Sequence, residues 1–212
     1  METLRFFKSH YTSLPHPTKK ITNQTIIITG SNTGLGLEAA RHFVRLDAAK
    51  VILAIRSISK GETAAASISA SEKRPGVLEV WELDLASWFA ERVKSLERLD
   101  VVVENAGVFV YSFSMAQGDE RTITVNVVSQ FLLGLLLMPK LRETAVMHDR
   151  EAVLTFVGSF VHWLTSFPER KAKDVSRSWR ARKRQIYMTS RSNTLPTPSL
   201  PSLHPEQRRT NT

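Results

Sequence analysis

The feature that most restricts the fold is a strand, a glycine turn and a helix that follow one another without a gap. Residues 26–43 are IIITGSNTGLGLEAARHF. The short, β-branched segment Thr25–Thr29 predicts a buried strand, and Leu35–Leu46 has helical periodicity. We expect one side of that helix to carry Leu35, Ala39, Phe43 and Leu46. A turn in this setting is typical of a site for a phosphate-bearing ligand.

Strands and helices continue to alternate along the chain. Further strands are predicted at Lys50–Ile55, Val77–Leu83, Asp100–Asn105 and Ala152–Ser159, with helices at Lys60–Ser71, Phe89–Leu99 and Ile123–Leu141, the last ending near Pro139. The strands are apolar on both faces, which indicates a parallel sheet covered by helices on both sides. We therefore predict an α/β fold, a Rossmann-like doubly wound parallel sheet that is incomplete, with about five strands in the order 3-2-1-4-5.

The charge distribution divides the chain into parts. Residues 1–168 hold 18 Lys and Arg against 17 Asp and Glu, whereas residues 169–212 hold 11 against 3. The net charge of +9 therefore belongs mainly to the end of the chain. We expect an N-terminal extension at 1–20, a Rossmann domain at 21–168, and a basic, Pro-rich, irregular and disordered tail at 169–212.

Composition excludes several classes of protein. The chain has no cysteine, so it has no disulfide framework and no thiolate metal site, and we expect no bound metal. The N-terminus lacks the apolar core of a secretory signal. No apolar run is long enough for a membrane span, and Phe131–Met138 is better interpreted as part of a buried helix. The default location is the cytoplasm.

Five motifs in fixed order point to one family. The turn TGSNTGLG has the spacing Thr-Gly-x-x-x-Gly-x-Gly, and LDL at residues 83–85, ENAG at 104–107, VN at 125–126 and VGS ending at Ser159 follow it. In this order they resemble the short-chain dehydrogenase/reductase family, in particular its fungal NADP-linked members. The ENAG motif has Glu104 where the family has Asn.

The resemblance implies a dinucleotide site. Gly30 permits the tight turn, while Gly34 and Gly36 let the backbone approach phosphate and the helix pack on the sheet. By resemblance, Asp84 meets the adenine ring, although an ordinary Asp at a strand end is the alternative. The cofactor-binding residues implied are Gly30, Ser31, Asn32, Gly34, Leu35, Gly36, Arg56, Lys60, Asp84, Asn105, Ala106 and Gly107.

Coenzyme choice depends on the end of the second strand. An acidic residue there favours the free 2′-hydroxyl of NAD. This chain has Arg56 and, shortly after, Lys60, both of which suit a 2′-phosphate. We predict NADP(H) as cofactor in preference to NAD, with a solvated surface arginine as the alternative.

The resemblance also implies a catalytic group. In the family, hydride moves between the nicotinamide and a carbonyl or alcohol carbon, and a Tyr transfers the proton. A Lys four residues later assists, because a phenol of pKa about 10 is a poor base at pH 7 without a nearby cation. The matching Ser is Ser159 and the matching Asn is Asn126; a plain strand-end Ser, and an Asn that satisfies a buried backbone group, are the alternatives.

The Tyr-x-x-x-Lys pair has no full match. Tyr187 is the one tyrosine after Ser159, and Arg191 stands four residues later. Arginine carries the positive charge, but its longer planar group changes the geometry. The alternative is that Tyr187 belongs to a disordered basic tail.

Three functions compete. The first is an NADP-dependent oxidoreductase that acts on a small carbonyl or alcohol. The second is a catalytically inactive cofactor-binding pseudoenzyme, or a gene product truncated or altered after about residue 170, without the usual dimer helix. The third is an interaction protein whose RARKRQ segment binds acidic partners or RNA, which the nearly neutral body disfavours.

Overall fold

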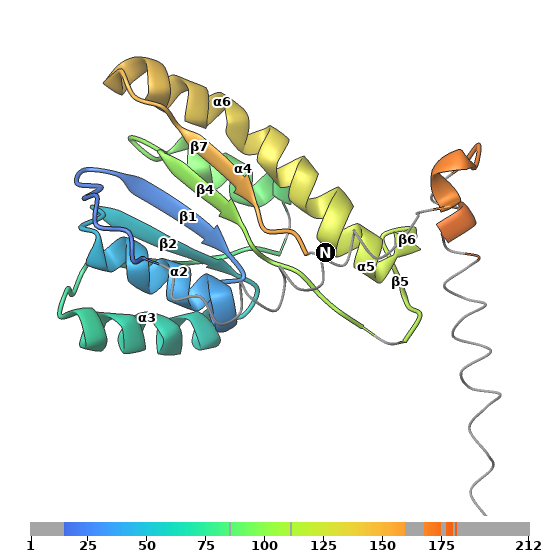
Figure 1. The fold of residues 1–212 in the computed structure, drawn as a ribbon, viewed down its shortest axis with the longest axis horizontal. Helices are drawn as coiled ribbons and strands as arrows, with labels where there is room; N and C mark the ends of the chain where they lie inside the picture. The colour runs from blue at the N-terminus through green and yellow to red at the C-terminus, as the bar shows by residue number, and fades with distance from the viewer. Residues whose placement is uncertain are drawn as a thin grey trace, which may run out of the picture.

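A parallel sheet of five strands forms the centre of the fold (Figure 1). The computed structural model describes residues 15–84, 86–110, 112–159, 168–174, 177–179 and 181. The strands are β1 (Thr25–Thr29), β2 (Lys50–Ile55), β3 (Leu78–Glu82), β4 (Val101–Glu104) and β7 (Val153–Phe156). They lie in the order β3-β2-β1-β4-β7, and every neighbouring pair is parallel. The predicted order 3-2-1-4-5 is confirmed, with β7 as the fifth strand.

Helices cover both faces of this sheet (Figure 1). On one face, α2 (Gly34–Arg45) and α3 (Ile58–Glu72) pack on the apolar side chains of β1 and β2. On the other face lie α4 (Ala86–Lys94) and α6 (Gln130–His148), which enclose a second core around Ile27 and Val102. All five residues of β1 are buried, as expected for a central strand covered on both sides.

The predicted apolar side of α2 is displaced by one residue from the most buried side, although Phe43 packs partly against the core. Leu35 is 77% exposed, and the buried residues are Gly36, Ala40 and Val44. Small residues at positions 36 and 40 let the helix axis approach the sheet closely, which larger side chains on the neighbouring stripe would prevent. The helix therefore packs on the sheet through the side that carries Gly36 and Ala40, and Leu35 on the neighbouring side stays exposed.

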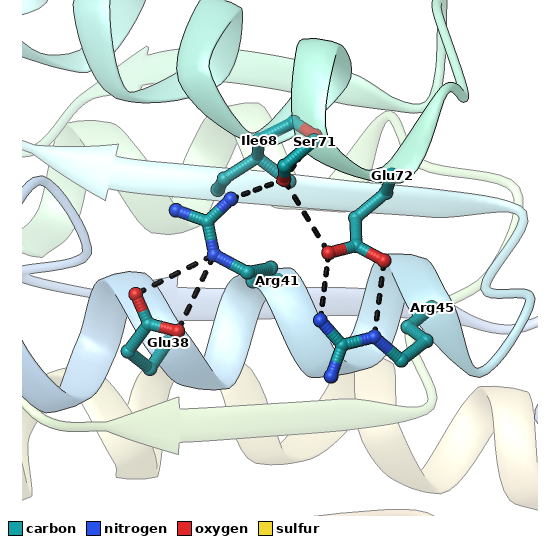
Figure 2. A network of polar contacts seen from close by, with 6 residues as sticks. All are labelled: Glu38, Arg41, Arg45, Ile68, Ser71 and Glu72. Atoms are coloured by element: carbon teal, nitrogen blue, oxygen red, sulfur yellow. Dashed lines mark hydrogen bonds and ion pairs between the residues drawn. The ribbon is translucent and has the colours of Figure 1, made fainter.

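A polar network joins α2 to α3 on the outer surface (Figure 2). Arg45 contacts the Glu72 carboxylate through two nitrogens, Nη2 to Oε1 at 2.8 Å and Nε to Oε2 at 3.0 Å. Arg41 donates to Ser71 and also contacts Glu38. The hydrogen bond from Arg45 holds the pKa of Glu72 below its ordinary value. The two helices are thus held side by side beneath the sheet.

The long apolar segment forms continuous helical structure in three parts. These are α5 (Arg121–Ile123), a π-helix η1 (Thr124–Ser129) and α6. The prediction that the helix ends near Pro139 is wrong, since α6 continues to His148 with Pro139 inside it. Proline removes one backbone hydrogen bond there, and Leu137 and Leu141, buried on either side of it, keep the helix packed on the sheet.

One side of this helix is exposed and apolar. Phe131 is 55% exposed and Leu135 is 64% exposed, so the expectation that Phe131–Met138 is wholly buried is wrong. The helical segment Arg121–His148 contains an 18-residue window with a mean hydropathy of 1.6, so by length and composition alone it could cross a membrane, but its other side lies against the sheet. The cytoplasmic location stays a prediction.

A short hairpin precedes α5 and has no clear signal in the sequence. It consists of β5 (Met115–Ala116) paired antiparallel with β6 (Asp119–Glu120). In the region predicted as a tail, the described residues include a 3-10 helix, η3 (Pro168–Lys171). The division into 1–20, 21–168 and 169–212 stays a prediction.

Candidate functional site

A cavity of about 610 Å³ opens at the carboxyl edge of the sheet. The ends of β1, β2, β3 and β4 contribute to its wall, together with η1 and the first turn of α6. Open α/β sheets bind ligands at this edge, where the strand order reverses between β1 and β4. Seven of the residues implied by the family resemblance line the cavity: Gly30, Asn32, Arg56, Asp84, Asn105, Ala106 and Gly107.

The glycine turn packs directly against the loop that follows β4. Gly30 has φ of 63°, and a Cβ atom there would lie 2.8 Å from the Cα atom of Ala106. A Cβ atom on Gly36 would overlap the Asn105 side chain and lie 2.8 Å from the carbonyl oxygen of Gly30. Gly34 has φ of 57°, with open space around it. The turn therefore needs glycine at positions 30 and 34 for conformation, and at position 36 for close approach.

Two side chains fasten the turn to that loop. Asn105 Nδ2 donates to the carbonyl oxygens of Thr29, at 3.0 Å, and Gly30, at 3.3 Å. Thr29 Oγ1 accepts from the backbone N–H groups of Asn105 and Ala106, each at 2.9 Å. The cavity wall is thus fixed by contacts between residues about 75 positions apart in the sequence.

Two ionisable groups lie at the β2 and β3 end of the cavity. Arg56 follows β2 directly, is exposed, and makes no hydrogen bond or ion pair within the described part of the chain. Asp84 lies two residues beyond β3 and is also exposed. An unpaired guanidinium at this position is suited to an anionic ligand group.

The other predicted cofactor residues do not line this cavity. Ser31 is fully buried, and its hydroxyl donates to the Ile28 carbonyl at 2.9 Å, which fixes the turn from inside. Leu35 and Lys60 are exposed, the first at the start of α2 and the second near the start of α3. Their assignment to the coenzyme stays a prediction.

Comparison with known proteins shows to which family the chain belongs. A family model described as short chain dehydrogenase matches residues 24–160, more than half of the chain. The chain belongs to the short-chain dehydrogenase family. The described cavity lies wholly within that matched range.

Fungal short-chain dehydrogenases are among its relatives. The chain is 46% identical over 198 residues to the short chain dehydrogenase atnD of Emericella nidulans, covering 90% of this chain and 62% of the relative. It is 47% identical over 171 residues to the short chain dehydrogenase/reductase dmxR8 of a Cryptosporiopsis species, covering 77% and 53%. The chain thus spans between half and two thirds of the length of these two relatives.

Solved short-chain dehydrogenases share the fold. A short chain dehydrogenase of Escherichia coli CFT073 in complex with NADPH has a TM-score of 0.57 and 25% identity, covering 82% of this chain and 71% of that chain. A short chain dehydrogenase of Shigella flexneri 2a in complex with NADP has a TM-score of 0.55 and 24% identity, covering 82% and 71%. The second likeness shows the fold alone.

Asn126, which the sequence analysis matched to the Asn of the family motif, lies on the π-helix η1. Asn126 Oδ1 accepts from the backbone N–H of Val108 at 2.8 Å, and its Nδ2 donates to the Val108 carbonyl at 2.9 Å. π-Helical turns often occur at functional sites. Here the amide joins η1 to the loop after β4, which is the backbone-satisfying role named as the alternative, and Asn126 does not line the cavity.

The proton-transfer residues are not brought together in the described structure. Ser159 lies three residues beyond β7, at the carboxyl edge of the sheet, but outside the cavity lining. Tyr187 and Arg191 lie outside the described residues. The catalytic assignments of Ser159, Asn126 and Tyr187 therefore stay predictions.

Three residues of the cavity wall with polar or ionisable side chains are among those that the sequence analysis did not assign to the site. Gln130 donates from its side-chain amide to the Ala106 carbonyl, and Arg121 lines the cavity from α5. The third is Glu104, which is only 1% exposed. Burial raises the pKa of its carboxyl to about 7, against the lowering effect of a hydrogen bond from Thr29. The Glu in the ENAG motif, in place of the usual Asn, was the sequence signal for an unusual site residue. Its burial becomes evident only in the folded structure.

Proposed function

We propose that this chain is an NADP-dependent oxidoreductase that transfers hydride between the nicotinamide and a small carbonyl or alcohol substrate. The observation that carries the proposal is a single cavity lined by the glycine turn, the Asn105–Gly107 loop and Arg56. Its volume lies within the range of about 300–1,000 Å³ that is usual for ligand sites. Membership of the short-chain dehydrogenase family, and the NADPH bound to the Escherichia coli relative, support the same proposal.

The residues present fit the proposed coenzyme. Backbone N–H groups at the start of α2 hold the diphosphate, because a helix N-terminus favours anions. The absence of side chains at Gly30 and Gly34 leaves room for its approach. The guanidinium of Arg56 pairs with the 2′-phosphate, and Asp84 accepts a hydrogen bond from the adenine amino group.

The reaction needs a hydride and a proton. NADPH, when bound, supplies the hydride to the carbonyl carbon. Ser159 donates a hydrogen bond to the substrate oxygen, and the hydroxyl of Tyr187 gives that oxygen a proton, assisted by the charge of Arg191. Asn126 holds the loop at Val108 in place.

A second function is favoured by a different observation. Both polar ends of the Asn126 amide are occupied by the backbone of Val108, and a tyrosine–lysine pair is replaced by Tyr187 and Arg191. A chain with these features binds the dinucleotide with little or no turnover. The two functions share the coenzyme site and differ in the proton-transfer step, which contributes about 10²–10⁴ in rate.

Coenzyme titration of the wild type and of Arg56→Ala tests the coenzyme site that the two proposed functions share. We expect NADPH to bind more tightly than NADH, and Arg56→Ala to weaken NADPH by about 1–3 kcal/mol while NADH changes little. Arg142→Ala, which removes an exposed arginine outside the cavity lining, is the matched control. Equal losses for both coenzymes contradict the role of Arg56. Turnover that is lost on Tyr187→Phe identifies the enzyme, and absent turnover with tight binding identifies the second function.

A further inference from the structure

Glu104 is a buried carboxyl in the wall of the coenzyme cavity, and the chemistry proposed above does not use it. It is the last residue of β4, lies between β1 and β7 in the sheet, and is 1% exposed. Its Oε2 atom accepts a hydrogen bond from Thr29 Oγ1 at 3.2 Å. Its Oε1 atom is buried and has no hydrogen-bond partner among the described residues. An ionised carboxylate with a free buried oxygen is costly, so the site disfavours the charged form.

The hydrogen bonds of Thr29 connect this carboxyl to the loop that contacts the ligand. A hydroxyl has one hydrogen to donate and two lone pairs that accept. Both acceptor positions of Thr29 Oγ1 are taken by the N–H groups of Asn105 and Ala106. Its hydrogen is directed at Glu104, with the Val103 carbonyl, at 3.5 Å, as the weaker choice. A change of charge at Glu104 therefore alters the hydrogen bonds and the electrostatic environment of the backbone N–H groups of Asn105 and Ala106.

Within the described part of the chain, the elements packed against Glu104 provide no charged partner for it. Strands β1 and β7 contain no ionisable side chain. The α6 helix runs opposite to β4, since Gln130 contacts Ala106 after the strand and Thr144 contacts Leu99 before it. Its ionisable residues, Lys140, Arg142, Glu143 and His148, all lie in the half near the start of β4. The ionisable residues that share the cavity with Glu104 are Arg56, Asp84 and Arg121.

We propose that binding of an anionic dinucleotide in this cavity takes up a proton at Glu104, so that coenzyme affinity falls as the pH rises through neutrality. The proposal rests on the coenzyme site proposed above. A bound dinucleotide places the negative charge of its diphosphate near Glu104, offsets the positive charge of Arg121, and removes water from the cavity. All three changes disfavour the ionised carboxylate. Glu104 is thus a positioning and pH-coupling residue, distinct from the groups that transfer the proton to substrate.

The expected size of the pH effect on coenzyme affinity follows from the linkage between coenzyme binding and proton binding. Burial already places the pKa of Glu104 at about 7 in the free protein. If binding raises this pKa by about one unit, coenzyme affinity falls about sevenfold between pH 6 and pH 8.5, and binding at pH 7.5 takes up about half a proton. Glu104→Gln has a neutral side chain of the same shape, so it keeps high affinity across this range and takes up no proton at this position.

The first arm of the test needs no coenzyme. The backbone amide signals of Asn105 and Ala106 are followed by NMR from pH 5.5 to 8.5 in the full chain. We expect an inflection near neutrality that is absent in Glu104→Gln and unchanged in Glu120→Gln. Glu120 is also 1% exposed, but its carboxylate accepts from the N–H groups of Thr122 and Ile123, which hold its pKa below the ordinary value. No inflection, or the same inflection in Glu104→Gln, overturns the proposal.

The second arm measures the coupling itself. Calorimetric titration with NADPH and with NADH, in buffers of different ionisation enthalpy, gives the protons taken up on binding. NADH is included because the 2′-phosphate of NADPH titrates near pH 6 and adds its own proton. We expect uptake with both coenzymes, reduced in Glu104→Gln by about half a proton at pH 7.5. Glu104→Asn serves as a second neutral variant if the glutamine variant does not fold.

The outcomes separate the two proposals. Binding whose proton uptake is equal in wild type and Glu104→Gln overturns the role of Glu104 and leaves the coenzyme site standing. Absence of binding at any pH overturns the proposed function and the coupling together, while the amide titration still reports whether Glu104 ionises near neutrality.

Discussion

The burial of Glu104 makes a quantitative prediction for the stability of the free protein. Its pKa is about 7 in the folded chain, against an ordinary value of 4.5. The native state therefore holds this proton more tightly than the unfolded state does. The stabilisation is fully present below pH 4.5 and is lost as the pH rises through about 7. A difference of about 2.5 pKa units corresponds to roughly 3 kcal/mol, of which about 2 kcal/mol falls between pH 5.5 and 8.5.

Urea denaturation followed by tryptophan fluorescence measures this effect. The free energy of unfolding of the wild type should fall by about 2 kcal/mol from pH 5.5 to 8.5, whereas Glu104→Gln should lose this component and be the more stable protein at pH 8.5. Glu120→Gln is the control, since Glu120 is equally buried but its hydrogen bonds keep its pKa low. Parallel pH profiles for wild type and Glu104→Gln would refute the reasoning.

Three further predictions each concern the packing, hydrogen bonding or exposure of one residue. Gly36→Ala should destabilise the fold by about 1–3 kcal/mol and weaken NADPH binding, because its Cβ atom overlaps Asn105; unchanged denaturation and binding curves would contradict this. Thr144→Val should cost about 1–3 kcal/mol in urea denaturation, because it leaves the buried N–H of Leu99 without the acceptor that now lies at 2.8 Å. Leu135→Gln should raise the soluble fraction on sedimentation, with stability changed by less than about 0.5 kcal/mol, because this leucine is 64% exposed.

Much of the sheet could be predicted because its signals are local. The segments Thr25–Thr29 and Lys50–Ile55 match the observed β1 and β2 in their bounds, since short β-branched runs flanked by turn residues leave few alternatives. The strand order followed from right-handed crossovers. Pro139 shows the limit of such signals: a proline usually ends a helix, yet packing of Leu137 and Leu141 carries α6 onward to His148.

The site could be predicted only where its residues are adjacent in the sequence. The glycine turn and the Asn105–Gly107 loop were identified as motifs, but their mutual packing depends on β1 and β4 becoming neighbours. The two-residue strands β5 and β6 are too short for a periodic pattern, so the hairpin before Arg121 was missed. The burial of Glu104 likewise follows from strand pairing, which a single sequence does not display.

The contacts that build the cavity do not involve the residues assigned to proton transfer. Thr29 and Asn105 join β1 to the loop after β4, and Gln130 joins that loop to α6. Each of these partners lies before residue 131, within the range that matches the short-chain dehydrogenase family. No contact among them requires Ser159 or Tyr187. Under the function proposed above, we therefore expect dinucleotide binding and proton transfer to be separable: substitutions at Thr29 or Asn105 should change coenzyme affinity, and Tyr187→Phe should change turnover alone.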